Sequence, residues 1–152
     1  MKPRLNPYQA APEGVKAMLA LENYVATCGL EKSLYYLVKT RASQINGCAY
    51  CIHMHTTDAI AEGETAERLF LLDAWRESPL YSDRERAALA WTEALTRIAE
   101  THAPDADYEL ARAQFSEAEL VNLTLLIGAI NAWNRLAIGF RSIHPVKVTK
   151  AA

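Results

Sequence analysis

Two cysteines and a histidine on one short segment are the residues of this chain whose types and spacing can do chemistry. They are Cys48, Cys51 and His55, and they follow the turn-forming pair Asn46-Gly47. If the segment after the turn is a helix, which advances by about 100° per residue, positions 48, 51 and 55 fall within about 60° of one another. Two thiols and an imidazole then share one face, which predicts a redox dithiol with its own base.

The spacing of the two thiols favours a reversible disulfide. Residues three apart on a helix have Cβ atoms about 5–6 Å apart, and a disulfide needs about 3.5–4.5 Å, so a small adjustment closes the bond. Cys48 is expected in or near the first helical turn, where free N–H groups and the helix dipole stabilise a thiolate. His55 lies four residues after Cys51. It can therefore take the proton of Cys51 directly or through one water.

The same segment leaves two other interpretations open. The pair can be two small buried hydrophobes, or it can bind zinc, because Cys48, Cys51, His53 and His55 offer four ligands within eight residues. His53 and His55 project about 160° apart on a helix, however, so one ion takes both only if the helix breaks. His53 is expected on another face, toward solvent or an interface, with a direct chemical role as the minor alternative. Cys28 stands near a helix end and is expected to be a packing residue.

The composition is that of an ordinary globular protein. The chain has 152 residues, of which 51% are hydrophobic and 22% charged, and its net charge is −2. This predicts one domain over residues 1–152, with a core at about 5–140 and a polar C-terminal tail. Scattered basic residues and the lack of an apolar run of about 18 residues predict neither nucleic acid nor membrane as a partner.

The start of the chain and its cysteine usage bear on the cellular compartment. The first seven residues lack the apolar stretch of a secretory signal, so a cytoplasmic location is expected. Structural disulfides are rare in the cytoplasm. A CxxC pair there more often indicates redox chemistry or metal binding.

Helical spacing of apolar residues predicts an all-α fold, a compact bundle of six to seven helices. Capping boxes are expected at Ser82–Glu85 and Ser116–Glu119, where each begins a helix. The last helix has apolar residues on more than one face, so it is expected at the centre of the domain or at a subunit interface, which favours an oligomer. The expected helices are 13–28, 31–45, 48–62, 65–76, 82–100, 105–113 and 117–140.

Two further sets of residues on these helices have structural interpretations. The three tryptophans, at 75, 91 and 133, are expected to pack in the core rather than to line a pocket. Asn131, Asn134 and Arg135 are polar residues on an otherwise apolar helix. They are expected to hydrogen-bond within the core or across subunits, and not to be catalytic.

The segment from Lys39 to Thr56 resembles the alkylhydroperoxidase D / carboxymuconolactone decarboxylase family. The Cys-x-x-Cys-x-x-x-His core of that family corresponds to Cys48, Cys51 and His55, and residues 129–136 are similar to the family's last core helix. The likeness covers about residues 5–140. It implies an all-helical, AhpD-like fold that assembles as trimers or hexamers.

The resemblance also implies an activity, which is thiol-dependent reduction of hydroperoxides. Cys51 corresponds to the attacking thiol, Cys48 to the resolving thiol and His55 to a member of a proton relay. The implied partners are a hydroperoxide substrate and an external dithiol reductant, with no bound cofactor or metal. The branch of the family that decarboxylates lacks the cysteine pair. The residues by themselves leave the reverse order open, in which Cys48 attacks.

The chain departs from the family pattern at the relay. Tyr36 stands twelve residues before the first cysteine, where the family usually has a glutamate, and no histidine lies between the cysteines. Tyrosine has a pKa near 10 and is a poor base at neutral pH, so Tyr36 either hydrogen-bonds within the relay or packs. Glu31 is not an evident replacement. The alternatives to a peroxidase are therefore a weakly active redox or protein-interaction module of the same fold, or a metal-binding module.

Overall fold

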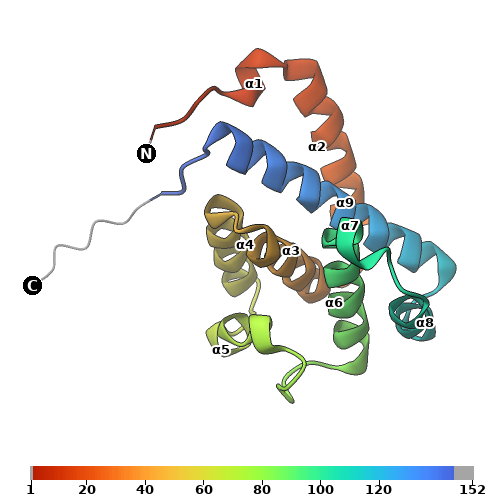
Figure 1. Ribbon diagram of the computed structural model, residues 1–152. Coiled ribbons are helices and arrows are strands. Elements are labelled where there is room, and N and C mark those ends of the chain that lie inside the picture. The colour runs from red at the N-terminus through yellow and green to blue at the C-terminus, as the bar shows by residue number, and fades with distance from the viewer. Residues whose placement is uncertain (1, 146–152) are drawn as a thin grey trace, which may run out of the picture.

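The computed structural model describes residues 2–145, and over these residues the chain is helical with no strand (Figure 1). The all-α prediction is confirmed, while the extent of the domain and the number of chains in an assembly stay predictions. The predicted number of six to seven helices is too low, because residues 2–145 form nine α-helices and one 3₁₀ helix, and the additional ones are short. The predicted tail beyond Pro145 lies outside the described residues. The helices are α1 (Pro7–Ala10), α2 (Pro12–Thr27), α3 (Lys32–Asn46), α4 (Ala49–Ala61), α5 (Ala66–Phe70), the 3₁₀ helix η1 (Leu72–Ala74), α6 (Asp83–Thr96), α7 (Ile98–Thr101), α8 (Asp105–Gln114) and α9 (Glu117–Phe140).

Local capping signals set several of the helix ends. Ser82 and Ser116 each accept a hydrogen bond from the third backbone N–H of the helix they begin, and the glutamate at that position bonds back, so both predicted capping boxes are confirmed. Gly47 ends α3 in the left-handed conformation, with φ at 69°. A glycine adopts this conformation without a steric cost, which explains the sharp turn between α3 and α4.

The predicted helix over 65–76 is wrong in its second half, where α5 gives way to η1. The buried side chains there are Leu69, Leu72 and Trp75, which recur every three residues. An α-helix would rotate such a series around its axis, whereas a 3₁₀ helix has three residues per turn and keeps the series on one face. The tighter helix therefore lets all three side chains reach the core.

One predicted helix is divided, and one short helix was not predicted. The helix expected over 82–100 divides at Arg97 into α6 and α7, and the hydroxyl of Thr101 donates to the carbonyl oxygen of Ala94 at 2.6 Å. No glycine or proline marks this break in the sequence. The short helix α1 was not predicted, although the Asn6-Pro7 pair is a helix-start signal and the Asn6 side chain caps α1.

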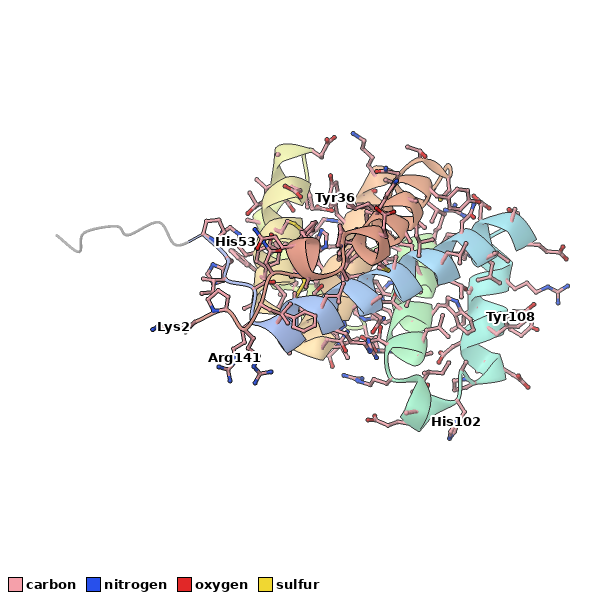
Figure 2. All side chains as sticks on the ribbon, turned by 90° about the horizontal axis from the view of Figure 1, so that it is seen from above. Lys2, Tyr36, His53, His102, Tyr108 and Arg141 are labelled. Atoms are coloured by element: carbon pink, nitrogen blue, oxygen red, sulfur yellow. A yellow bond between two sulfur atoms is a disulfide. The ribbon has the colours of Figure 1, made fainter. Side chains whose placement is uncertain are left out.

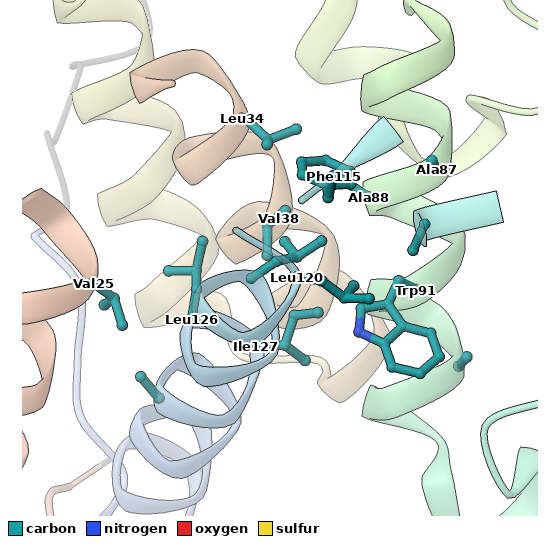
Figure 3. Close-up of a cluster of buried hydrophobic side chains, with 14 residues drawn as sticks. Val25, Leu34, Val38, Ala87, Ala88, Trp91, Phe115, Leu120, Leu126 and Ile127 are labelled. Atoms are coloured by element: carbon teal, nitrogen blue, oxygen red, sulfur yellow. The ribbon is translucent and has the colours of Figure 1, made fainter. Parts of the chain in front are cut away.

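The helix α9 passes through the centre of the molecule and packs against α2, α3 and α6 (Figure 1). Figure 3 shows side chains from α3, α6 and α9 that meet in one apolar cluster, including Val38, Trp91 and Ile127. By length and composition α9 could cross a membrane, with a mean hydropathy of 1.3 over 18 residues. Eight of its 24 residues are buried, including Leu123, Ile127 and Ile130, so we interpret it as a core helix, in agreement with the predicted central position. Val121, Leu125 and Ile138 on the same helix are exposed, and the alternative of a subunit interface stays a prediction.

The helices α3 and α4 form a hairpin whose tip is Gly47. In such a hairpin, residues at equal distances before and after the tip lie side by side. The N-terminal segment runs back along the end of α9, where the backbone N–H of Arg4 donates to the carbonyl oxygen of Phe140 at 2.9 Å. Figure 1 accordingly shows the N-terminus and the end of α9 on the same side of the molecule. These three parts enclose the site described next.

Candidate active site

The two cysteines lie at the start of α4, as predicted. Cys48 is the N-cap residue, and its sulfur accepts a hydrogen bond from the backbone N–H of Cys51 at 3.4 Å. The two cysteines are paired as a disulfide, with 5.4 Å between their Cα atoms, and each is 1% exposed. They pack against Ala42 of α3 and Ile130 of α9. The helix start therefore places both sulfurs where free N–H groups can stabilise a thiolate.

His55 lies on the same face one turn after Cys51, also as predicted, and is 4% exposed. Its burial, together with the charge of Lys39, lowers its pKa to about 3, although the charge of Glu22 acts in the opposite direction. The imidazole is therefore neutral at physiological pH. Among the described residues its Nδ1 atom has no hydrogen-bond partner. A buried polar atom of this kind is usually satisfied by water or by a bound molecule.

A cavity of about 620 Å³ opens beside these residues, and Cys51 and His55 form part of its wall. The wall is assembled from the N-terminal segment, α1, α2, α3, α4 and α9 and the segment that follows α9. A mostly apolar cavity with a few converging polar groups is typical of a small-molecule site. Its apolar side chains include Leu19, Met54, Trp133, Leu136 and Phe140.

A partly buried polar cluster that the sequence analysis missed lies in the same wall. Glu22 on α2 accepts hydrogen bonds from the ammonium of Lys39 and the hydroxyl of Tyr35, both on α3, and from Nε1 of Trp133 on α9 at 2.9 Å. Burial raises the pKa of Glu22, but the charge of Lys39 and these hydrogen bonds outweigh it and lower the pKa overall. Glu22 is therefore a carboxylate at neutral pH.

A pattern in the sequence could have identified Glu22. The apolar stripe of α2 includes Val15, Met18 and Val25, and position 22 continues that stripe at the same helical spacing. An acidic residue on the inward stripe of a helix requires a buried partner. The prediction for Trp133 is only partly right, because this half-buried residue packs against the cluster around the cysteines but also lines the cavity. The predictions for Trp75 and Trp91 are confirmed.

Tyr36 lines the cavity but does not replace the missing glutamate as a base. Its ring meets that of Tyr35 edge-on, with 5.2 Å between the ring centres. Burial raises its pKa, and the carboxylates of Asp58 and Glu62 raise it further. Tyr36 is therefore protonated at neutral pH and can donate a hydrogen bond. In the described part of the chain no hydrogen bond joins its hydroxyl to His55, so its relay role stays a prediction.

His53 is exposed on another side of α4, as the helical spacing predicted. Its ring stacks on that of His144, with 5.0 Å between the ring centres. Figure 2 shows His53 close to the segment that follows α9, and His102 at the other end of the molecule. Over residues 2–145, no group of three or more histidine, cysteine or acidic side chains is arranged to hold a metal ion. The structure therefore does not bring His53 to the dithiol.

Cys28 and the asparagines that the sequence analysis singled out on the last helix form hydrogen bonds within the fold. Cys28 is half-buried at the end of α2, and its thiol donates to the carbonyl oxygen of Val25 at 3.3 Å. The Asn46 amide donates to the side-chain oxygens of Asn131 at 3.0 Å and Asn134 at 2.8 Å. Asn134 in turn donates to the hydroxyl of Ser43 at 3.0 Å. These amides join the end of α3 to α9, directly before the dithiol. Of the two predicted alternatives, hydrogen bonding within the core or across subunits, the structure shows the first.

The neutral state of His55 predicts a specific dependence of stability on pH. The unfolded chain binds a proton on His55 near pH 6.5, whereas the folded chain does so only near pH 3. Between these values acidification favours unfolding, by up to about 1.4 kcal/mol per pH unit. We expect His55→Asn to lose this contribution, so that the free energies of unfolding of wild type and variant converge from pH 6 to pH 4.

Denaturant unfolding at pH 7, 6, 5 and 4 measures this difference. His102→Asn is the matched control, because His102 is exposed and asparagine tolerates its left-handed backbone, with φ at 54°. The control should keep the pH dependence of the wild type. A constant difference between wild type and His55→Asn across this range would contradict a buried, neutral imidazole.

Comparisons with known proteins place this site in a family. A sequence model of the carboxymuconolactone decarboxylase family matches residues 12–94. The uncharacterized protein YdfG of Bacillus subtilis is 43% identical over 138 residues, which make up 91% of this chain and 94% of that protein. A crystal structure from Agrobacterium tumefaciens, of a protein of unknown function described as a candidate antioxidant defence protein AhpD, is 52% identical. It covers 96% of this chain and 100% of that one, with a TM-score of 0.93.

A more distant structure extends the likeness of the fold. An uncharacterized peroxidase-related protein from Silicibacter sp. TM1040 is 24% identical, with a TM-score of 0.79, and the match covers 91% of this chain and 74% of that one. At this identity the likeness shows the fold alone. The overall helical fold is therefore shared with a protein whose sequence is only distantly similar.

Proposed function

Because the chain belongs to the carboxymuconolactone decarboxylase family and carries a cysteine pair at a cavity wall, we propose that it is a thiol-dependent peroxidase of the AhpD type that reduces organic hydroperoxides. The observation that carries this proposal is the position of the disulfide. Cys51 lies on the wall of a largely apolar cavity, next to an imidazole whose Nδ1 atom has no partner among the described residues. A hydroperoxide supplies both an apolar body and a polar head for such a site.

In the first step, the thiolate of Cys51 attacks the terminal oxygen of the hydroperoxide. An S–O bond forms, the O–O bond breaks, and the sulfur becomes a sulfenic acid. The leaving alkoxide takes up a proton by way of His55 and departs as the alcohol. The neutral imidazole suits this role, because it can pass a proton on without retaining a charge in a buried site.

In the second step, the thiol of Cys48 attacks the sulfur of the sulfenic acid. The S–S bond forms, the S–O bond breaks, and the hydroxide leaves as water with the proton of Cys48. An external dithiol then reduces the disulfide by two exchange steps and is itself oxidised to a disulfide. The Cα separation of 5.4 Å supports this cycle, because it lies in the range of protein disulfides and α4 need not move far.

Counting thiols in the reduced protein tests the proposal. One equivalent of tert-butyl hydroperoxide should remove two thiols per chain and yield one equivalent of tert-butanol. Hydrogen peroxide should react at least about tenfold more slowly, because it has no alkyl group that could contact the apolar side chains of the cavity wall. The double variant Cys48→Ser, Cys51→Ser is the control and should lose no thiols.

The outcome that contradicts a peroxidase is equally specific. If the hydroperoxide leaves the thiols unchanged while a small dithiol still reduces the disulfide readily, the protein is a redox module of the same fold. The replacement of the family glutamate by Tyr36 is the feature that motivates this alternative.

A further inference from the structure

The cavity wall contains a lysine that is almost completely removed from solvent. Lys39 is 2% exposed and lies on α3, eight residues before the tip of the hairpin, level with His55, which lies eight residues after it. Lysine is rarely buried to this extent unless it is paired. Its ammonium contacts Glu22 and the hydroxyl of Tyr35, the latter at 2.7 Å. Burial lowers the pKa of Lys39, although the charge of Glu22 and the hydrogen bond to it act in the opposite direction. The pairing with Glu22 therefore favours a positive charge inside the site.

The ammonium of Lys39 retains hydrogen-bonding capacity toward the cavity. It has three N–H donors, and among the described residues it has two hydrogen-bond acceptors, Glu22 and Tyr35. Glu22, by contrast, accepts from three donors, including Trp133 of α9. The negative charge of the pair is thus shared among several donors, while the ammonium keeps one donor for a further acceptor.

Lys39 lines the same cavity as Cys51 and His55 of α4. Its charge lowers the pKa of His55, which lies one turn from Cys51. His55 itself is neutral and supplies no positive charge. The other charged groups in the cavity wall are the carboxylates of Glu22 and Asp58, and the remaining titratable groups besides His55 are tyrosines. A thiolate formed at Cys51 therefore has one positively charged side chain in this wall.

We propose that Lys39 is the positioning cation that stabilises the thiolate of reduced Cys51, and that Glu22 moderates how much of this charge the sulfur experiences. This inference depends on the proposed function only for the choice of Cys51 as the reacting thiol. When Cys51 loses its proton to solvent, the new negative charge is balanced by the ammonium of Lys39 and by the N-terminus of α4. Glu22 competes for the same ammonium and weakens the effect.

The two members of the pair should therefore shift the titration of Cys51 in opposite directions. We expect Lys39→Met to raise the midpoint of the thiolate titration by about 1 pH unit, because an attractive charge is removed. Glu22→Gln should lower the midpoint, because the ammonium loses its anionic partner. General damage to the site would move both variants in the same direction, so the opposite signs distinguish electrostatics from structure.

Thiolate absorbance at 240 nm against pH measures these midpoints, in reduced full-length protein with Cys48 replaced by serine. The spectrum of Cys48→Ser, Cys51→Ser protein is subtracted, so that only Cys51 contributes. Lys32→Met is the matched control, because Lys32 is exposed on the same helix and pairs with Glu62 at 2.9 Å. This control should leave the midpoint unchanged.

The results separate this inference from the proposed function. Midpoints that do not move, or that move in the same direction in Lys39→Met and Glu22→Gln, overturn the role of Lys39 even if the wild type consumes hydroperoxide. Opposite shifts support it even if hydroperoxide is not consumed. If Lys39→Met does not fold, Glu22→Gln decides the question, because its glutamine removes the charge and keeps one acceptor oxygen for Lys39 and Tyr35, although it loses the acceptor for Trp133.

Discussion

Cys51→Ser is expected to lose at least about a thousandfold of the hydroperoxide turnover. Serine keeps the size of the side chain, but its hydroxyl is not ionised at neutral pH and cannot replace a thiolate as the nucleophile. The cysteine is 1% exposed and lies on the cavity wall, which neither Cys48 nor Cys28 lines. Turnover is measured as loss of tert-butyl hydroperoxide in the presence of excess dithiol.

The corresponding variant of Cys48 distinguishes the attacking thiol from the resolving thiol. Cys48→Ser should consume one equivalent of hydroperoxide and stop at the sulfenic acid, because no resolving thiol is present. Dimedone should then label the peptide that carries Cys51. Cys28→Ser is the control and should turn over like the wild type, since Cys28 bonds to its own helix outside the cavity. Labelling of Cys48 in the Cys51→Ser variant would reverse the order of attack.

The second large expected effect is a loss of folding stability when the buried carboxylate of Glu93 is removed. It accepts hydrogen bonds from Nε of Arg41 at 2.8 Å, from Nε1 of Trp75 at 2.8 Å and from Arg76, and it is 7% exposed. Burial raises its pKa, but these three donors outweigh burial and lower it. The cluster joins α3 and α6 to the segment after η1, which explains why a charge is retained inside the fold.

We expect Glu93→Ala to reduce the free energy of unfolding by about 3–5 kcal/mol. The substitution leaves the guanidinium of Arg41 buried without this partner and the Trp75 N–H without its acceptor. Denaturant unfolding at neutral pH measures the loss. Glu109→Ala is the matched control, because Glu109 also pairs with an arginine, Arg112, but at the surface, and it should cost less than about 1 kcal/mol. Equal losses in the two variants would contradict the role of burial.

The sequence alone predicted several local features of this protein correctly. The common helix face of Cys48, Cys51 and His55, the turn at Gly47 and the capping box at Ser116 are all confirmed. Each of these features lies within one helix or one turn. The geometry there repeats every 3.6 residues, so the spacing of the residues is sufficient to place them.

Local patterns failed where a helix must adapt to what surrounds it. The region after Phe70 continues as a 3₁₀ helix because Leu72 and Trp75 reach a core built from other helices. The division at Arg97 has no glycine or proline that could have announced it. In both places the tertiary packing, and not the propensity of the residues, sets the boundary.

The tertiary structure alone decided the chemical environment of the dithiol. Trp133 and Glu22 are 111 residues apart in the chain and are hydrogen-bonded in the cavity wall, beside Lys39 of a third helix. The neutrality of His55 likewise follows from its burial, which no spacing within α4 reveals. A helix fixes the direction of its own side chains, but the charge and solvent exposure that each one meets depend on which faces of the other helices pack against it.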